Sequence, residues 1–322
     1  MARTIVGILR GGTSSEYDLS LKTGAAMLAA LPEEKYDARD IFIDKKGMWH
    51  SRGIPVEPVR SLAQIDVVLN ALHGGVGEDG TVQRLLDRSG VAYAGSRAQP
   101  SALSHNKART HEIVRAAGVL VPRMVAFSVG SDMTTADMAR SIFSSFGPPY
   151  VVKPVSEGAS RGIRLVDTII ELPDALGDTL DEFGSAAVQE FIRGEDARVG
   201  LIEGFRGEEL YALPPAHMLR SEGKRFIDAQ TRKEGMVRHV VPSNFSDAEK
   251  RALMDAARAV HRSIGLAHYS RVDFILARGK PYLLEVTSVP GLYEGAAFPQ
   301  MLEAVGSSVP EFLEHAIALA RN

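Results

Sequence analysis

The chain has 322 residues, of which 45% are hydrophobic and 24% are charged, and its formal net charge is -3. This length and composition predict two or three subdomains around a sizeable core, and they exclude a disordered protein. The charge balance argues against a surface that covers long stretches of nucleic acid, and the absence of cysteine excludes disulfides and thiolate metal sites. The apolar run at the N-terminus is too short for a membrane span and no signal-peptide cleavage site follows it, so we expect a cytoplasmic protein with no membrane partner.

The first third of the chain has the pattern of a parallel α/β sheet. Residues 4–9 are a β-branched and aliphatic run and residues 19–31 have the period of a helix, so the Gly/Ser-rich turn between them completes a strand-loop-helix unit. Residues 67–72 and 81–88 repeat this order. We therefore expect a doubly wound parallel α/β domain over residues 1–97.

The rest of the chain predicts two strand-rich subdomains. Residues 150–153 and 163–166 are expected as two strands joined by a Gly-containing loop, and residues 187–192 and 198–202 as another pair. The expected units are a central subdomain, residues 98–188, and a C-terminal subdomain, residues 189–322.

Two further segments stand out in the C-terminal part. Residues 224–240 are polar and without sustained period, which predicts a long loop, and loops of that length in compact domains are usually functional or disordered. Residues 248–264 have the pattern of an amphipathic helix, and a last helix is expected after Pro310.

A hairpin near the C-terminus carries the strongest signal. If two strands are centred on a turn at Gly279, Asp273 lies opposite Glu285 and Arg271 lies opposite Thr287, with all four side chains on one face. The other face is then uniformly apolar and would hold Val272, Phe274, Leu276, Tyr282, Leu284 and Val286. This separation of polar and apolar residues favours the register, because a slip by one residue would destroy it.

The paired carboxylates of this hairpin indicate a cation site. Asp273 and Glu285 repel each other unless positive charge lies between them, and hard oxygen ligands suit Mg²⁺ held together with phosphate oxygens. The alternative is a surface ion-pair patch in which Arg271 neutralises Asp273.

The segment after Lys153 has the residues of a phosphate-binding loop. A lysine at a strand end, followed by a loop with Gly158 and Gly162, brings one cation and several backbone N–H groups toward one anion. The alternative is a flexible connector. Residues 187–192, an apolar strand that ends in an acidic turn, fit adenine and ribose binding or an ordinary strand and turn.

Together these elements resemble the D-alanine:D-alanine ligase family of the ATP-grasp fold, in order along nearly the whole chain. The segments that carry the resemblance are GGTSSEYDLS, ALHGGVGEDGTVQ, SALSHNKAR, VVKPVSEGASRG, QEFIRGED and RVDFILARGKPYLLEVTSVPG. Each segment is weak alone, but agreement of six in order by chance is improbable. The resemblance implies a two-subdomain ATP-grasp part after the N-terminal domain, and a homodimer.

The resemblance also implies a role for each matching residue. ATP would be bound by Lys107, Lys153, Ser160, Gln189, Glu190, Phe191 and Asp196, with Asp196 at the ribose. Mg²⁺, or Mn²⁺ in its place, would be held by Asp273, Glu285 and Thr287. The amino-acid substrates would contact Glu16, His73, Ala159, Arg232, Lys233 and Ala296.

The reaction that the family resemblance implies has two steps. The carboxylate of the first D-alanine attacks the γ-phosphate of ATP, and the amine of the second attacks the resulting acylphosphate. Glu16, Arg271 and Gly291 are the expected catalytic residues: Glu16 pairs with the first ammonium group, while Arg271 and the N–H of Gly291 stabilise the tetrahedral oxyanion.

Several positions depart from the family pattern and affect mainly the substrates. Thr287 replaces an asparagine, Ala159 and Ala296 replace serines, Gln189 replaces a glutamate, and residues 224–240 lack the tyrosine expected near Arg232 or Lys233. ATP chemistry is therefore better supported than the identity of the second substrate. The alternatives are a dipeptide or depsipeptide ligase with another second substrate, and a nucleotide-binding protein without ligase activity.

Overall fold

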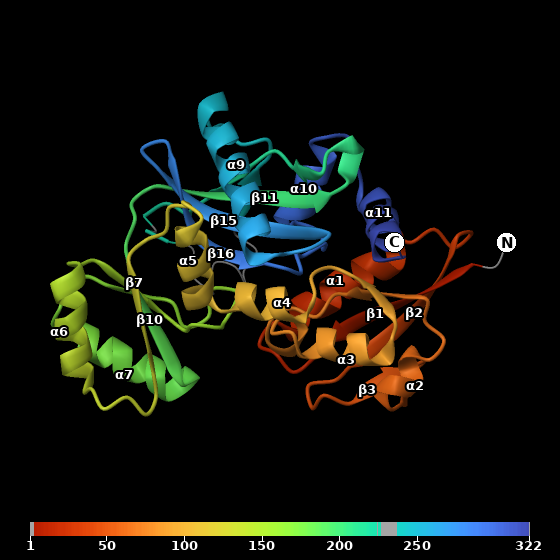
Figure 1. Ribbon diagram of the computed structural model, residues 1–322, viewed down its shortest axis with the longest axis horizontal. Coiled ribbons are helices and arrows are strands. Elements are labelled where there is room, and N and C mark those ends of the chain that lie inside the picture. Colours follow the sequence, from red (N-terminus) through yellow and green to blue (C-terminus); the bar gives the residue numbers. More distant parts are fainter. Residues whose placement is uncertain (1–2, 224, 227–236, 322) are drawn as a thin grey trace.

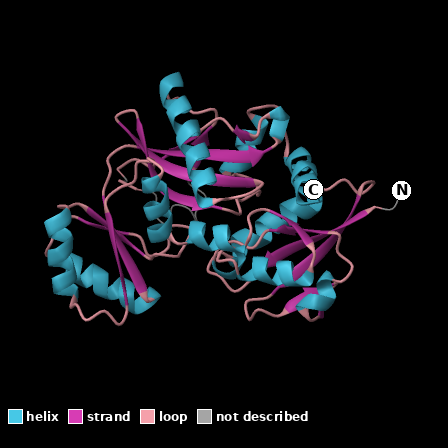
Figure 2. Ribbon diagram, in the orientation of Figure 1, coloured by secondary structure: helices cyan, strands magenta, loops and turns pink. Residues whose placement is uncertain are grey.

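The computed structural model describes residues 3–223, 225–226 and 237–321. Three sheets follow one another along the chain, and helices lie beside each of them (Figures 1 and 2). The central sheet stands apart from the other two in this view, and helix α5 lies between it and the C-terminal sheet (Figure 1). This arrangement places the polar site described below where the central and C-terminal sheets approach each other.

The N-terminal sheet has the strand order β4-β3-β2-β1-β5-β6. Its strands are β1 (Thr4–Gly11), β2 (Tyr36–Ile43), β3 (Trp49–Ser51), β4 (Ile54–Pro55), β5 (Val67–Asn70) and β6 (Ala92–Ala94). Strands β2, β1, β5 and β6 are parallel, as the sequence predicts, whereas β3 and β4 form an antiparallel edge that the sequence analysis did not include. The neighbouring helices are α1 (Tyr17–Ala30), α2 (Pro58–Leu62), α3 (Thr81–Ser89) and α11 (Val309–Arg321).

Helix α11 comes from the C-terminal end of the chain but packs on the N-terminal sheet. Phe312, Leu313 and Ile317 share one core cluster with Val6 and Leu69 of β1 and β5. The first and last segments of the chain therefore form one packed unit, and this packing ties the N-terminal sheet to the C-terminal part (Figure 1).

The central sheet has the order β7-β10-β8-β9 and is antiparallel. Its strands are β7 (Met124–Ser128), β8 (Tyr150–Lys153), β9 (Arg164–Val166) and β10 (Ser185–Glu190), and its helices are α6 (Thr135–Ser145) and α7 (Leu172–Phe183). The predicted hairpin of residues 150–153 and 163–166 is confirmed as β8 and β9. The expected boundary after residue 188 falls inside β10.

The C-terminal sheet has the order β14-β13-β11-β15-β16, with β12 also on β11. Its strands are β11 (Glu195–Glu203), β12 (Leu210–Ala212), β13 (Ala216–Leu219), β14 (Arg238–Val240), β15 (Tyr269–Ala277) and β16 (Lys280–Thr287). Helices α4 (Ala98–His105), α5 (Lys107–Ala116), α9 (Asp247–Ile264) and α10 (Ala297–Glu303) complete this part. Helix α9 begins at a capping box in which Ser246 and Glu249 satisfy each other's backbone N–H groups, and its predicted span is confirmed.

Two predictions about strands in this region were wrong. Residues 187–192 and 198–202 do not pair, because β10 already has β7 and β8 on its two edges, so β11 joins the next sheet. The end of the segment expected as a loop, residues 224–240, forms β14, which pairs with β13. Residues 224 and 227–236 of that segment lie outside the described residues.

The hairpin of β15 and β16 has the predicted register at its polar end only. Arg271 lies opposite Thr287 and Asp273 opposite Glu285, but past a bulge Phe274 lies opposite Leu283. A two-residue turn, Arg278 and Gly279, closes the hairpin with φ angles of 50° and 73°. A turn with positive φ at both central residues matches the twist of the paired strands, which favours this two-residue turn. The turn is shorter than the predicted one, and the bulge in β16 accommodates the residue that is left without a partner in β15.

The bulge also changes which residues of β16 face the core. Leu283 is fully buried in the cluster with Val272 and Phe274, whereas Leu284, which the predicted register placed in the core, lines the pocket described below. Tyr282, the other residue expected in the core, is only partly buried.

Candidate active site

A large pocket opens between the central and C-terminal sheets. It encloses about 890 Å³ of empty space, part of it open to solvent. Its floor comes from β15 and β16 and its opposite wall from β8 and β10. The polar residues that line it are Lys107, Lys153, Ser160, Gln189, Asp196, Arg220, Arg225, Asp273 and Glu285. Six of the seven expected ATP-binding residues line this pocket, and Glu190 is the exception.

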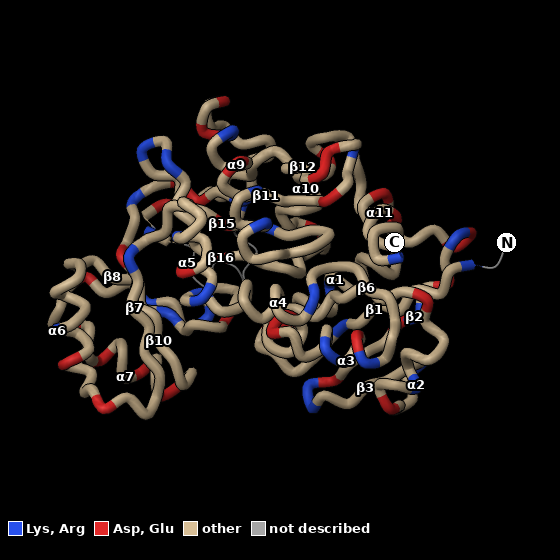
Figure 3. The backbone as a smooth tube through the Cα atoms, in the orientation of Figure 1, with Lys and Arg blue, Asp and Glu red and all other residues tan. Residues whose placement is uncertain are grey.

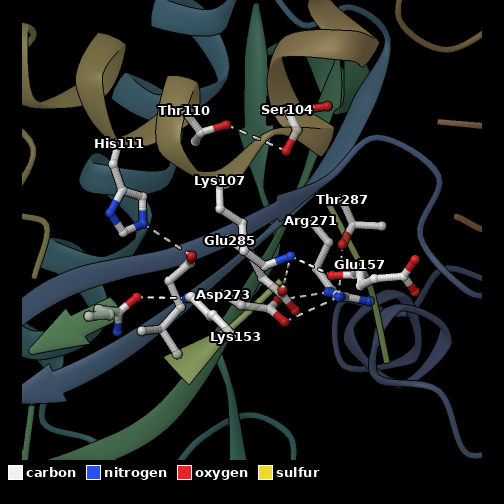
Figure 4. Close-up of polar contacts among 12 residues, drawn as sticks. Ser104, Lys107, Thr110, His111, Lys153, Glu157, Arg271, Asp273, Glu285 and Thr287 are labelled. Carbon is white, nitrogen blue, oxygen red and sulfur yellow. Dashed lines mark hydrogen bonds and ion pairs between the residues drawn. The ribbon is translucent and has the colours of Figure 1, made fainter. Parts of the chain in front are cut away.

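Helix α5 directs two side chains toward β16. Lys107 and His111 are four residues apart, so they share one face of the helix. The Nζ atom of Lys107 donates to the backbone oxygen of Glu157 at 2.5 Å and lies 3.7 Å from Glu285 Oε2 (Figure 4). Asn106 caps the helix through the N–H of Arg109 and so fixes where this face begins.

His111 contacts the bulge that separates the two registers of the hairpin. Its Nε2 atom lies 3.2 Å from the backbone oxygen of Leu284, the residue before Glu285 (Figure 4). Burial, together with the nearby charge of Lys153, lowers the pKa of His111 to about 3. The imidazole is therefore neutral at physiological pH, and Nε2 carries the proton that it donates. This hydrogen bond fixes the position of the segment of β16 that contains Glu285.

The floor of the pocket holds a network around Asp273, which is only 6% exposed. Arg271 donates from Nε to Asp273 Oδ1 at 2.7 Å and from Nη2 to Oδ2 at 3.1 Å (Figure 4). The same Nη2 atom donates to Thr287 Oγ1 at 2.9 Å. On the neighbouring strand β11, Arg198 lies directly opposite Asp273 and donates from Nε to Oδ2 at 3.1 Å.

Lys153 lies at the end of β8 and points into the pocket. Its Nζ atom donates to Gln189 Oε1 at 2.7 Å. Burial lowers the pKa of Lys153 to about 7, and the charge of Lys107 acts in the same direction. Gln189 is neutral, so its hydrogen bond stabilises the charged form of Lys153 less than a carboxylate would. An anionic ligand would stabilise the charged form and so raise the pKa of Lys153 again.

The adenine and ribose candidates lie at the far end of the pocket. Asp196 accepts from Arg220 Nε at 2.5 Å, so a ribose hydroxyl would meet an ion pair at this position. The carboxylate of Glu190 turns toward Arg123, which binds it with Nε and Nη2. The N–H of Glu190 also donates within the protein, to Arg123 O, so it is not available to a base.

Phe191 forms part of the pocket wall, and the guanidinium of Arg225 lies 5.2 Å from the centre of its ring. The N–H of Phe191 donates to Pro149 O, so this residue, like Glu190, has used its backbone donor. Neighbouring Ile192 lines the same wall. A planar base would therefore meet an apolar wall next to an arginine.

The phosphate loop reaches across to the N-terminal domain. Ser15 Oγ donates to Glu157 Oε2 at 3.2 Å, and a Cβ added at Gly158 would lie 2.1 Å from Glu16 Oε1. A residue with a side chain at this position would therefore have to displace the Glu16 carboxylate. Ala159 and Ser160 have φ angles of 48° and 61°, in the left-handed region that costs non-glycine residues free energy.

A second polar cluster lies beside the loop of residues 73–80. His73 is buried, Thr23 Oγ1 contacts its Nε2 at 2.7 Å, and burial and the charge of Arg271 lower its pKa to about 4. Burial, reinforced by the charge of Glu16, raises the pKa of Glu78 to about 8. Glu78 accepts from the N–H of Gly74 at 2.9 Å. Both side chains are therefore neutral at pH 7.

The remaining expected site residues lie on the segment after β16 or outside the described residues. A Cβ at Gly291 would lie 2.7 Å from the ring of Tyr293, so a larger residue there would have to displace that ring. Ala296 is the N-cap of α10 and makes no side-chain cap bond. Arg232 and Lys233 lie outside the described residues.

Comparison with known proteins identifies the family. Residues 113–318 match the family model described as D-ala D-ala ligase C-terminus, and residues 54–96 match the model described as D-ala D-ala ligase N-terminus. The chain belongs to the D-alanine:D-alanine ligase family. It is thus an ATP-dependent ligase of the ATP-grasp fold, as the resemblance implies.

Individual ligases of this family are similar over almost their whole length. The D-alanine–D-alanine ligase of Anaeromyxobacter dehalogenans (strain 2CP-C) is 32% identical over 316 residues, which are 96% of this chain and 94% of that protein. The crystal structure of the D-alanine–D-alanine ligase from Bacillus anthracis complexed with ATP is 25% identical and covers 98% of this chain and 97% of that one, with a TM-score of 0.81. The VanG D-Ala:D-Ser ligase from Enterococcus faecalis is 24% identical, covers 99% and 100%, and shares the fold with a TM-score of 0.87.

The donor set of this ligase site fits Mg²⁺ held together with a nucleotide. Asp273 and Glu285 lie opposite each other and both line the pocket. Among residues 3–223, 225–226 and 237–321, no three His, Cys, Asp or Glu side chains form a metal cluster. Mg²⁺ is commonly bound by one or two carboxylates plus substrate phosphates, so two carboxylates suffice when a triphosphate supplies the rest.

Positive charge is concentrated near this site. In Figure 3, several Lys and Arg segments lie near α5 and β16, left of the centre of the view, whereas α6 and α7 carry several acidic segments. Sequence reasoning did not assign Arg198, His111 or Glu78 to the site. Only Glu78 had a signal, since it lies in the quoted segment ALHGGVGEDGTVQ, whereas the other two come close through pairing between distant segments.

Proposed function

We propose that this protein joins two D-alanine molecules at the expense of ATP, giving D-alanyl-D-alanine for peptidoglycan synthesis. The observation that carries the proposal is the carboxylate pair of Asp273 and Glu285, flanked by Lys107 and Arg271 in a pocket of nucleotide size. A protein that only binds nucleotide has little need of Arg271 at this position. The family match supplies the class of reaction.

The nucleotide half of the reaction uses the pocket floor and the two lysines. Lys107 and Lys153 would contact the phosphates, and Asp273, Glu285 and the hydroxyl of Thr287 would hold Mg²⁺. Bound there, Mg²⁺ neutralises charge on the transferring phosphoryl group. Because Lys153 has a pKa of about 7, a triphosphate would draw a proton onto it and so strengthen its own binding.

The first chemical step makes an acylphosphate. A carboxylate oxygen of the first D-alanine attacks the γ-phosphorus, a new O–P bond forms, and the bond to the β-γ bridging oxygen breaks, so that ADP leaves. Glu16 would hold the ammonium group of this substrate, since it lies against the phosphate loop at Gly158. The contact between Ser15 and Glu157 would help keep water out of this space.

The second step forms the peptide bond. The neutral amine of the second D-alanine attacks the carbonyl carbon of the acylphosphate and gives a tetrahedral oxyanion. Arg271, which Asp273 orients through two hydrogen bonds, and the N–H of Gly291 would stabilise that oxyanion. The oxyanion then collapses, phosphate leaves, and the amine loses its proton to solvent.

The test is phosphate release from ATP and Mg²⁺ with D-alanine alone and with D-alanine paired with D-serine, D-lactate or L-amino acids, with products identified by mass. We expect release with D-alanine alone and a D-alanyl-D-alanine product. Release only with a mixed pair would replace the second substrate, and ATP binding without release would contradict ligase activity.

Assembly and location are part of the same proposal. Within the described part of the chain no helix is long and apolar enough to cross a membrane. We expect a homodimer that acts in the cytoplasm, where ATP is available. Light scattering after size-exclusion chromatography checks the dimer, which should have twice the mass of one chain.

A further inference from the structure

A small cavity lies between the N-terminal domain and the polar end of the β15–β16 hairpin. Helix α3, strand β6 and helix α4 border it on one side, and Tyr269, Ser288 and Val289 border it on the other. Its free space fits about one water molecule. Tyr269 comes two residues before Arg271 and Ser288 directly follows Thr287, so the cavity adjoins the strand ends that carry the proposed site.

The side chain of Gln83 on α3 lines this cavity and has a buried oxygen atom without a donor. The residue is only 3% exposed, and its Nε2 atom donates to Gly77 O at 2.8 Å. A carbonyl oxygen such as Gly77 O can only accept, so this bond fixes which way the amide points. Within the described part of the chain, no donor reaches Gln83 Oε1. Asn70 Nδ2 also donates to Gly77 O, at 2.9 Å, so Gly77 O does not depend on Gln83.

Ser288 is a second buried polar residue of the cavity. It is 2% exposed, and none of the described residues forms a hydrogen bond with its Oγ atom. The hydroxyl of Tyr269 lies beside Gly95, another residue of the cavity wall, because a Cβ added at Gly95 would lie 3.4 Å from it. Buried polar groups without partners are unfavourable, and a buried water typically makes about three hydrogen bonds to such groups. The cavity thus offers a water molecule one amide oxygen and two hydroxyls.

The segment that begins at Ser288 is irregular and depends on side chains for its position. Residues 288–292 are buried but belong to no helix or strand. Among the described residues, no backbone–backbone hydrogen bond of a loop or turn involves them. The buried ring of His73 contacts the backbone of Val289. A second attachment, at Ser288, would fix this segment and with it the N–H of Gly291, three residues further on.

We propose that one buried water molecule bridges Gln83 Oε1 and Ser288 Oγ, and that these two residues thereby hold the N–H of Gly291 in place for the peptide-bond step. The water donates to the amide oxygen and bonds to the serine hydroxyl, and the hydroxyl of Tyr269 offers a third contact. Gln83 and Ser288 are positioning residues, because they act on the oxyanion only through Gly291. Their role in the reaction rests on the proposed function, whereas the water bridge does not.

The first experiment is a high-resolution crystal structure of the wild-type protein. We expect one ordered water within hydrogen-bond distance of both Gln83 Oε1 and Ser288 Oγ. A cavity without water, or a direct hydrogen bond between the two side chains, would overturn the proposal. Because this readout does not depend on activity, an inactive protein with the water in place would contradict the proposed function and not the bridge.

The second experiment separates positioning from stability. Ser288→Ala, which removes the hydroxyl, should lower kcat about tenfold and leave the KM for D-alanine and the affinity for an ATP analogue unchanged, because the oxyanion forms only during the reaction. Ser288→Thr keeps the hydroxyl and should keep kcat near wild type. Ser307→Ala, just before α11, removes another buried serine hydroxyl and should reduce stability without a change in kcat. An unchanged kcat in folded Ser288→Ala would overturn the positioning role.

The third experiment tests whether the two residues act through one water. Gln83→Met removes the amide and leaves Gly77 O with its bond from Asn70. Combined with Ser288→Ala, it should lower kcat no further than the stronger single variant, about tenfold, because both substitutions remove the same bridge. A loss of about a hundredfold in the double variant would show independent effects and overturn the bridge. If Gln83→Met does not fold, the crystal structure and the Ser288 variants decide.

Discussion

The two halves of the proposed active site are built from different kinds of structure. The nucleotide half, Lys107, Lys153, Asp273 and Glu285, sits on helix α5 and on strands whose side chains are fixed by ion pairs and hydrogen bonds. The substrate half, Glu16, His73, Gly291 and Ala296, comes from connections between elements. Regular elements hold the charges that phosphoryl transfer requires, whereas connections can change with the substrate.

The departures from the family pattern occur in both halves, but those on the nucleotide side keep their hydrogen bonds. Ala159, Ala296 and the positions near Arg232 and Lys233 are those that the family resemblance assigns to the substrates. On the nucleotide side, Gln189 still accepts from Lys153, and the Thr287 hydroxyl still binds Arg271. Substitutions in the two halves should therefore affect different measurements.

Arg271→Met should have the largest effect, because in the proposed mechanism Arg271 stabilises the oxyanion and is held in place by Asp273. We expect kcat to fall by about 10³, the scale of losing a main electrostatic contact to a transition state. The fold should survive, since Arg198 still pairs with Asp273. Steady-state phosphate release measures kcat, and Arg258→Met on α9 is the matched control, expected to keep wild-type activity. A fall of less than tenfold would remove Arg271 from the chemistry.

Glu78→Gln tests the polar cluster that lies beside the substrate half, with the free energy of unfolding as the readout. The pKa of Glu78 is raised to about 8 in the folded protein from 4.5, so between these pH values the folded state holds a proton that the unfolded state has lost. Stability therefore falls as pH rises from about 4.5 to about 8. The neutral amide cannot ionise, and it should keep the bond from Gly74.

The expected result is a difference that grows with pH. At pH 8, Glu78→Gln should be more stable than wild type by on the order of 3 kcal/mol, and near pH 5 the two should be alike. Urea unfolding at the two pH values measures this. An equal difference at both values would mean that Glu78 does not titrate across this range.

His111→Phe tests whether the nucleotide half depends on the position of Glu285. The substitution removes the donor to Leu284 O at the bulge and fills a similar volume. Glu285 would lose its fixed position, and we expect the affinity for nucleotide with Mg²⁺ to fall about tenfold and affinity in EDTA to change little. His111→Gln, which can donate the same bond, should recover most of the loss. His261→Phe, another buried histidine outside the site, should be destabilised without any change in nucleotide affinity.

What the sequence could predict in this site was local. Strict alternation around a short turn is enough to bring Asp273 opposite Glu285. The bulge escaped prediction because the turn takes two residues with positive φ, Arg278 and Gly279, and Arg278 has no sequence signal for that conformation. The helices expected over residues 19–31, 81–88 and 248–264 likewise follow from periodicity.

Nonlocal pairing accounts for what the sequence could not predict. Arg198 reaches Asp273 only because β11 pairs with β15 across more than seventy residues of chain. The expected pairing of residues 187–192 with 198–202 was wrong for a related reason. These two segments are adjacent in sequence, but they belong to different sheets. The neutral state of Glu78 depends on burial by the folded chain, which spacing does not encode.

Ala296→Ser should have the smallest effect. It restores the serine of the family pattern and tests whether that hydroxyl contributes to the substrate half. Ala296 is the N-cap of α10 with φ -70° and ψ 152°, a conformation in which serine accepts a bond from the first turn of a helix. Stability should therefore rise by about 0.5 to 1 kcal/mol. A hydroxyl that also meets the second substrate would lower the KM for D-alanine two- to threefold with kcat unchanged. A rise in stability with an unchanged KM would mean that the hydroxyl serves only the helix, and that the identity of the second substrate is determined elsewhere in this half.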